Sequence, residues 1–140
     1  MLDIGSSTGG FTDCALQNNI KKVIDIDVGN NQLVDKIKNN PKVYVFENTD
    51  IRNFENKLLD NIDIITIDIS FISVTKILDK IKTITNAKEI ICLIKPQFEC
   101  GKSLADEYKG IILNKEIHKE VINKVINSFQ NIDYNLQGLT

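Results

Sequence analysis

The sequence has no tryptophan, only two prolines and three cysteines among its 140 residues. The cysteines are odd in number and none forms a CxxC pattern, which argues against both a disulfide framework and a zinc site. The longest apolar runs, such as residues 90–94, are far shorter than the roughly 20 residues of a membrane-spanning helix, and no signal-peptide pattern opens the chain. We therefore expect a cytoplasmic protein with reduced thiols, no bound metal and no membrane partner.

The chain also lacks an excess of basic residues. Lysine and arginine number 17 against 19 aspartates and glutamates, for a formal net charge of −2. A protein that binds nucleic acid by itself usually carries a strongly basic surface. If RNA is the substrate, a local patch or another module must supply much of the attraction.

What the sequence does contain is a regular alternation of two hydrophobic patterns. Short β-branched runs alternate with segments of helical period, which indicates βαβ units and a parallel sheet. The runs are nearly uniformly apolar, as strands covered on both faces should be. We predict strands at residues 1–4, 22–26, 42–46, 62–67 and 89–94, with a further strand at 134–139.

The segments between the strands predict helices. Leu33, Val34 and Ile37 form one stripe that ends near residue 39, and residues 77–84 repeat apolar positions every three or four residues. The clearest helix follows a predicted N-cap at Asn114 and keeps one apolar face over residues 117–129. Residues 97–110 lack periodicity and predict a loop. We expect residues 1–140 to form a single α/β domain without repeats or linkers.

A glycine-rich turn joins the first predicted strand to a helix. Gly5 allows a tight turn, and Gly9 and Gly10 let the backbone approach a ligand where a side chain would clash. The GxxxGG spacing differs from the motifs of dinucleotide binders and phosphate-binding loops, which argues against a nicotinamide-dependent dehydrogenase. An ordinary βα connection is the alternative. The segment reads Asp3, Ile4, Gly5, Ser6, Ser7, Thr8, Gly9, Gly10 and Phe11.

Two acidic residues follow the next two strands. Asp27 comes 22 positions after Gly5, where a carboxylate can accept hydrogen bonds from both hydroxyls of a ribose. Asp50 follows the third strand and can accept from an exocyclic adenine amine, although a turn or cap role fits it equally well. With the glycine turn, Asp27 suits an adenosyl ligand.

Asp68 and Lys95 follow the fourth and fifth predicted strands. Ligands of open α/β sheets bind outside the carboxyl ends of the strands, so we expect Asp68 in the same crevice as the glycine turn. Pro96 stops the fifth strand and fixes where Lys95 points, which is beside Asp68 if the two strands are neighbours. The alternatives are a helix-capping role for Asp68 and a solvated position for Lys95.

Together these motifs resemble those of the TlyA-like rRNA methyltransferases, also known as the hemolysin A family and related to the FtsJ-like RNA methyltransferases. The stretches that carry the resemblance are LDIGSSTGGFTDC, DVGNNQL, DISFIS and LIKPQFE. The resemblance implies a doubly wound, mostly parallel, Rossmann-like fold that is incomplete at its C-terminal strands. It also implies an S-adenosylmethionine site, to which we assign Asp3, Gly5, Ser6, Ser7, Thr8, Gly9, Gly10, Phe11, Asp27 and Asp50.

The resemblance further implies methyl transfer to a ribose 2′-hydroxyl of ribosomal RNA, with the RNA or a ribosomal subunit as the partner. Of the family's Lys-Asp-Lys-Glu catalytic set, Asp68 matches the aspartate and Lys95 the second lysine. The other two positions, and the family's S4-type RNA-binding domain, fall outside this sequence. We therefore expect a truncated core that binds cofactor better than it catalyses, with a noncatalytic binding fragment as the alternative.

Overall fold

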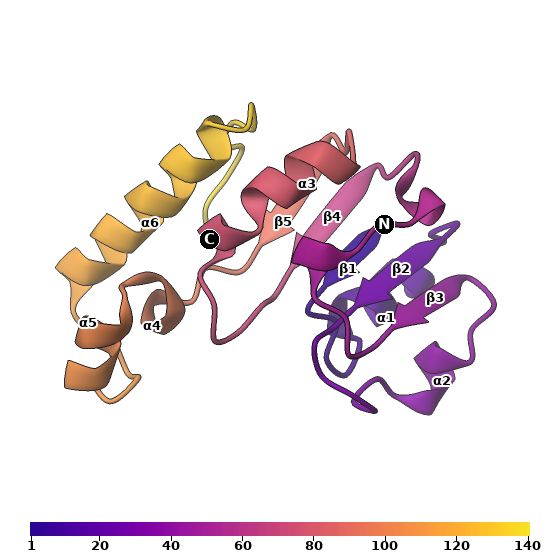
Figure 1. Ribbon diagram of the computed structural model, residues 1–140, viewed down its shortest axis with the longest axis horizontal. Coiled ribbons are helices and arrows are strands. Elements are labelled where there is room, and N and C mark those ends of the chain that lie inside the picture. The colour runs from indigo at the N-terminus through magenta and orange to yellow at the C-terminus, as the bar shows by residue number, and fades with distance from the viewer. The chain divides into compact units, whose positions relative to one another are not determined.

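The computed structural model describes residues 1–140, which divide into two compact units (Figure 1). The first, here called the sheet unit, comprises Met1–Asp68 and Thr83–Leu93. The second, here called the helical unit, comprises Ile69–Lys82 and Ile94–Thr140. That residues 1–140 act as one domain stays a prediction.

Five parallel strands form the sheet unit's framework. They are β1 (Leu2–Ile4), β2 (Val23–Ile26), β3 (Val43–Phe46), β4 (Ile64–Ile67) and β5 (Glu89–Cys92), in the order β3-β2-β1-β4-β5. All five strands predicted ahead of residue 100 are confirmed, each one or two residues shorter than expected. The chain winds outward from β1 in both directions, which is the strand order of a Rossmann-like sheet. The predicted α/β class with a parallel sheet is therefore confirmed.

The three central strands hold the core of the sheet unit. Leu2, Ile24 and Ile65 have no exposed surface, and every residue of β1 and β2 is buried. The edge strands are more open, since Tyr44 on β3 is 42% exposed and Ile91 on β5 is 49% exposed. The central strands are therefore covered on both faces, whereas the edge strands are partly open to solvent.

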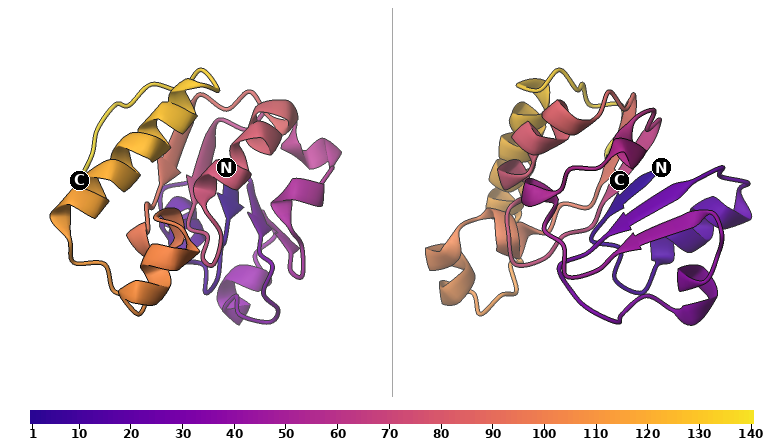
Figure 2. Two further views of the ribbon diagram at one scale, coloured as in Figure 1. Left: turned by 60° about the vertical axis from the view of Figure 1, so that its left-hand side comes forward. Right: turned by 45° about the vertical axis from the view of Figure 1, so that its right-hand side comes forward.

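Short helices connect the strands of the sheet unit. They are α1 (Gly10–Gln17), α2 (Asp35–Lys38) and the 3-10 turns η1 (Ile51–Asn53) and η2 (Lys57–Leu59). Figures 1 and 2 show α1 against one face of the sheet, and α2 lies beside β3. The helix predicted around Leu33 to Ile37 is a single turn, α2, that ends at Lys38 with Asn39 as its C-cap; Leu33 and Ile37 are buried and Val34 is half exposed.

The helical unit is organised around its last helix, α6 (Lys115–Gln130). The predicted apolar face is confirmed, because Ile117, Val121 and Val125 are buried. The predicted N-cap is also confirmed, since the Asn114 side chain accepts hydrogen bonds from the backbone N–H groups of Glu116 and Ile117. The unit also contains η3 (Val74–Lys76), α4 (Pro96–Glu99) and α5 (Lys102–Glu107), and α4 packs beside α6 (Figure 1). Helix α3 (Leu78–Ile84) begins in this unit and ends in the sheet unit.

Two sequence predictions are wrong. Residues 97–110 are not a plain loop, because they contain most of α4 and all of α5, separated by Gly101 with a φ of 91°. Helices of four and six residues are too short to show an apolar period. Residues 134–139 form no strand, since no neighbouring strand pairs with them. None of the helices combines the length and apolar character needed to cross a bilayer.

The buried and exposed isoleucines of the sheet provide a test of this core. Ile65→Ala removes a fully buried side chain from the central strand β4, and should lower the free energy of unfolding by about 3 kcal/mol. Ile91→Ala, on the edge strand β5, should lower it by less than about 1 kcal/mol. Urea unfolding of both variants measures the difference, and equal losses would contradict the assigned core.

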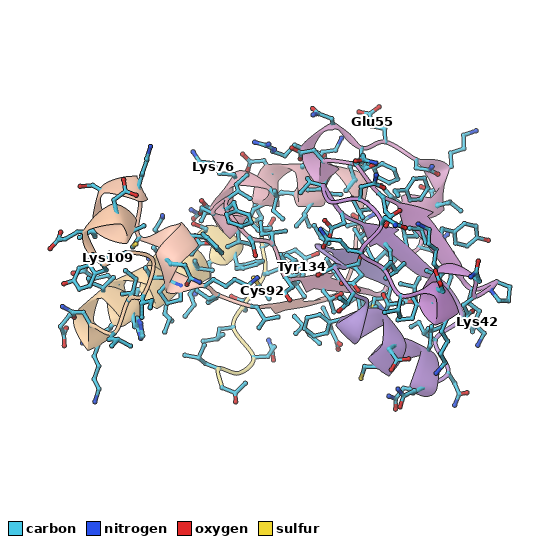
Figure 3. All side chains as sticks on the ribbon, turned by 90° about the horizontal axis from the view of Figure 1, so that it is seen from below. Lys42, Glu55, Lys76, Cys92, Lys109 and Tyr134 are labelled. Atoms are coloured by element: carbon cyan, nitrogen blue, oxygen red, sulfur yellow. The ribbon has the colours of Figure 1, made fainter.

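Cys92, the half-buried last residue of β5, is labelled in Figure 3.

Candidate functional site

The loops that follow β1, β2 and β4 leave the sheet at the same edge. Three backbone hydrogen bonds extend the strand pairing by one residue each: Gly5 N to Ile26 O at 2.8 Å, Asp27 N to Phe46 O at 3.1 Å and Asp68 N to Ile4 O at 2.9 Å. Gly5, Asp27 and Asp68 therefore lie side by side along the carboxyl edge of the sheet unit. This is the edge at which open α/β sheets bind their ligands.

The glycine turn after β1 has an unusual backbone. Gly5, Ser7 and Gly9 have positive φ angles of 81°, 48° and 98°, and Gly9 N donates to Ser6 O at 2.7 Å. A positive φ suits glycine because it has no Cβ to clash with the neighbouring carbonyl. Helix α1 starts directly after this turn, at Gly10.

The two adjacent glycines of the turn have different roles. A Cβ on Gly9 would lie 2.5 Å from Ile37 Cδ1 and 2.8 Å from Leu33 Cδ1, and the φ of 98° would strain any side chain there, so the backbone and the packing of the sheet unit both favour glycine. A Cβ on Gly10 would meet no atom within 4 Å. The sequence predicted that a ligand could approach the backbone at both Gly9 and Gly10, but of the two only Gly10 has open space beside it.

Asp27 ties the glycine turn to the loop after β2. Its Oδ2 accepts a hydrogen bond from Ser7 N at 2.7 Å, and its Oδ1 accepts one from Gly29 N at 2.7 Å. The Ser7 hydroxyl also donates to Gln32 Oε1 at 3.3 Å. Each oxygen of an ionised carboxylate has two acceptor positions, so Asp27 keeps the capacity to accept from a ligand.

Asp50 caps a turn and forms an ion pair. Its Oδ1 accepts from Arg52 N at 2.9 Å, and both of its oxygens accept from the Arg52 guanidinium. Hydrogen bonding to Arg52 holds the pKa of Asp50 below its ordinary value. The cap role named as an alternative for Asp50 is confirmed, whereas its contact with adenine stays a prediction.

Asp3 is buried in a polar cluster that sequence analysis missed. Asp3, Asp25 and Thr12 have no exposed surface, and Thr66 is 2% exposed. Thr12 Oγ1 lies 2.7 Å from Asp3 Oδ2 and 2.6 Å from Asp25 Oδ1, while Thr66 Oγ1 donates to Asp3 Oδ1 at 2.7 Å. Burial raises the pKa of Asp3, and burial raises the pKa of Asp25 to about 7. The signal for this cluster was an acid in the middle of each of two buried strands, Asp3 in β1 and Asp25 in β2.

Lys95 lies in the helical unit, at the N-cap position of α4. Its Nζ donates to Ser70 Oγ at 2.9 Å. The strands β4 and β5 are paired, and the chain leaves the sheet unit after them at Asp68 and at Leu93. Ser70 lies two residues after Asp68, and Lys95 lies two residues after Leu93. The predicted approach of Lys95 to Asp68 stays a prediction.

The residues around Ser70 include two features that the sequence did not indicate. Phe71 is 92% exposed with a φ of 67°, and its ring centre lies 5.3 Å from that of Phe98. Glu99 is only 4% exposed and accepts hydrogen bonds from Val74 N at 2.7 Å and from Ser73 Oγ. The Glu99 carboxylate therefore fastens α4, and with it Lys95, to the segment that carries Ser70.

Comparison with known proteins gives consistent matches. Residues 1–139 match the family model of FtsJ-like methyltransferases. The chain is 46% identical over 111 residues to the 23S rRNA (cytidine-2′-O)-methyltransferase TlyA of Campylobacter jejuni, which covers 79% of this chain and 43% of that protein. It is 43% identical over 129 residues to Hemolysin A of Brachyspira hyodysenteriae, with coverage of 89% and 53%.

The fold has the same relatives. A solved structure from Lactococcus lactis, described as a candidate hemolysin, superposes with a TM-score of 0.84 at 41% identity and covers 94% of this chain and 64% of that one. The chain spans about half the length of the curated relatives it matches.

The different environments of Gly9 and Gly10 predict different effects of the same substitution. Gly9→Ala adds a Cβ at a positive φ and against Ile37, and should lower the free energy of unfolding by about 2 kcal/mol or more. Gly10→Ala should change it by less than about 1 kcal/mol, because the space is open and alanine favours a helix. Thermal or urea unfolding distinguishes the two, and a Gly10→Ala variant as unstable as Gly9→Ala would contradict the described turn.

Proposed function

The chain belongs to the FtsJ-like methyltransferase family, and on that premise we propose that it binds S-adenosylmethionine and methylates a ribose 2′-hydroxyl of ribosomal RNA. The observation that carries the proposal is the shared sheet edge of the glycine turn, Asp27 and Asp68. The similarity to a relative named as a 23S rRNA (cytidine-2′-O)-methyltransferase supports the choice of reaction and substrate.

The residues of the sheet edge suit an adenosyl cofactor. Open space at Gly10 gives a ligand access to the backbone at the start of α1. The unused acceptor positions of Asp27 suit two ribose hydroxyls, and Asp50 lies after the neighbouring strand, where we assign it to the adenine. The turn residues assigned to the cofactor are Gly5, Ser6, Ser7, Thr8, Gly9, Gly10 and Phe11, while buried Asp3 supports them through Thr12.

The catalytic roles fall to Asp68 and Lys95. When bound, S-adenosylmethionine supplies an electrophilic methyl group on a positively charged sulfur. A sugar hydroxyl is a poor nucleophile, so a base would have to take its proton as the C–O bond forms and the methyl–sulfur bond breaks, releasing S-adenosylhomocysteine; we assign Lys95 as that base. The hydrogen bond to Ser70 orients Lys95. Asp68, at the carboxyl edge of the sheet unit, is assigned the aspartate role of the same catalytic set.

The exposed aromatic side chain beside Ser70 supports RNA as the substrate. A phenylalanine rarely adopts a positive φ, and strained backbone of this kind gathers at functional sites. Phe71 presents most of its ring to solvent, next to the residue that holds Lys95. An aromatic face in this position can stack on an unpaired nucleobase.

Substitution of Asp27 tests the cofactor site. Asp27→Asn keeps the size of the side chain but removes acceptor capacity, so it should weaken S-adenosylmethionine binding by about tenfold or more. Asp13→Asn on α1 is the matched control, because that carboxylate bonds to Gln17 and should leave the affinity within about twofold. Calorimetric titrations with S-adenosylmethionine and with a nicotinamide dinucleotide measure both. Tighter binding of the dinucleotide would refute the proposed cofactor.

Substitution of Lys95 tests the chemistry. Lys95→Ala should slow methyl transfer about 10²–10⁴-fold, since it removes the base, while S-adenosylmethionine affinity stays within about twofold. Lys102→Ala, at an exposed position on α5, is the control and should keep full activity. Transfer of a tritiated methyl group to ribosomal RNA measures both, with the longest polypeptide that the gene encodes.

Two outcomes would count against this assignment. A Lys95→Ala variant with more than about a tenth of the parent rate would exclude Lys95 as the base. Cofactor binding without any transfer by the parent polypeptide would instead support a noncatalytic binding protein.

A further inference from the structure

The buried cluster of Asp3, Thr12 and Asp25 contains two short oxygen–oxygen contacts, and each of them needs a hydrogen between the two oxygens. Thr12 Oγ1 lies within hydrogen-bonding distance of a carboxyl oxygen of Asp3 and of one of Asp25, at 2.7 and 2.6 Å. A threonine hydroxyl has a single hydrogen and can donate to only one of them. If both carboxyls were ionised, the hydroxyl could donate to one carboxylate oxygen, and its oxygen would face the other carboxylate oxygen with no proton between them. One of the two acids must therefore carry a proton.

The surroundings identify Asp25 as the protonated acid. Asp3 has hydroxyl groups near both of its oxygens, from Thr12 and Thr66, as an ionised carboxylate requires. The second oxygen of Asp25 is buried and has no hydrogen-bond partner. An unpaired oxygen is tolerated better on a neutral acid than on a carboxylate. The hydrogen bonds then run from Asp25 to Thr12 and from Thr12 to Asp3.

The charged neighbours that raise the pKa values of the two acids are themselves acidic. Asp68, after β4, acts on Asp3, while Asp3 and Asp27, after β2, act on Asp25. Thr12 and Thr66 face the pair from α1 and β4 and carry no charge. Burial raises the pKa of both acids, and that of Asp25 to about 7.

We propose that Asp25 is a positioning residue of the cofactor site, which as a neutral acid holds the first turn of α1 through Thr12. The proposal rests on the proposed function, because Thr12 lies two residues after Gly10 and the turn it anchors is the one assigned to S-adenosylmethionine. Loss of the Asp25 proton removes one hydrogen bond of the cluster and places two buried negative charges across one hydroxyl. The glycine turn is then less well anchored, and cofactor affinity falls as the pH rises.

The first test concerns the proton and needs no cofactor. The folded protein keeps the Asp25 proton at pH values where the unfolded chain has released it. Stability should therefore fall between about pH 4 and pH 7 and level off above. Asp25→Asn keeps a donor toward Thr12 but cannot ionise. Between about pH 4 and pH 7 the unfolding equilibrium constant of this variant should therefore change about a hundredfold less than that of the parent protein. Asp13→Asn, an acid of α1 outside the cluster, should respond like the parent protein.

Two further measurements secure this test if Asp25→Asn folds poorly. The ¹³C carboxyl resonances of Asp3 and Asp25 in the parent protein should show one of the two acids titrating near neutral pH. Thr12→Ser, which keeps the hydroxyl, should retain the parent's pH response, whereas Thr12→Val should alter it. Carboxyl titrations that are both complete below about pH 5 would overturn the shared proton.

The second test concerns the cofactor turn. The dissociation constant for S-adenosylmethionine, measured at pH 6 and pH 8.5, should rise at least about threefold more in the parent protein than in Asp25→Asn. The ratio of the two proteins removes the titration of the cofactor itself. Equal pH responses of affinity, together with different responses of stability, would overturn the positioning role. Failure of both proteins to bind S-adenosylmethionine at either pH would refute the proposed function, while the proton test would still stand.

Discussion

The pairing of β1 with β2 on one side and β4 on the other is the constraint on which the rest of the structure depends. Parallel pairing places the carboxyl ends of all three strands at one edge, and the hydrogen bonds of Gly5, Asp27 and Asp68 continue that pairing into the loops. Residues far apart in the sequence thereby become neighbours. A one-residue slip of any strand would turn its side chains to the opposite face and break the edge apart.

The same pairing makes the buried polar cluster necessary. Asp3 and Asp25 are register partners on β1 and β2, and Thr66 is the partner of Asp3 on β4. Three polar side chains therefore meet inside an apolar sheet, where an unsatisfied polar group costs about 1–3 kcal/mol. Thr12, from the first turn of α1, supplies the hydroxyl between the two acids. Thr12 thus ties the first turn of α1 to β1 through Asp3 and to β2 through Asp25.

Local patterns predicted the fold well, because a strand that is buried on both faces of the sheet appears in the sequence as a short apolar run. The central strands could be found from their apolar runs, and the start of α6 from Asn114, whose cap bonds reach only two and three residues along the chain. The buried cluster could not be found in this way, since its hydrogen bonds join residues 9, 13 and 63 positions apart. The helices α4 and α5 were missed because they are shorter than two helical turns.

The candidate site, like the fold, could be predicted only where the signal is local. Each acidic residue could be placed after a strand, but its hydrogen-bond donors could not be predicted, such as Arg52 for Asp50 and Ser7 for Asp27. These partners decide how much of each carboxylate is left for a ligand. Asp50 is engaged through both oxygens by a cation, whereas Asp27 accepts only backbone N–H groups, which lie at positions fixed by the fold. The hydrogen bond from Ser7 N therefore links Asp27 to the glycine turn, so the two parts of the proposed cofactor site hold each other in position.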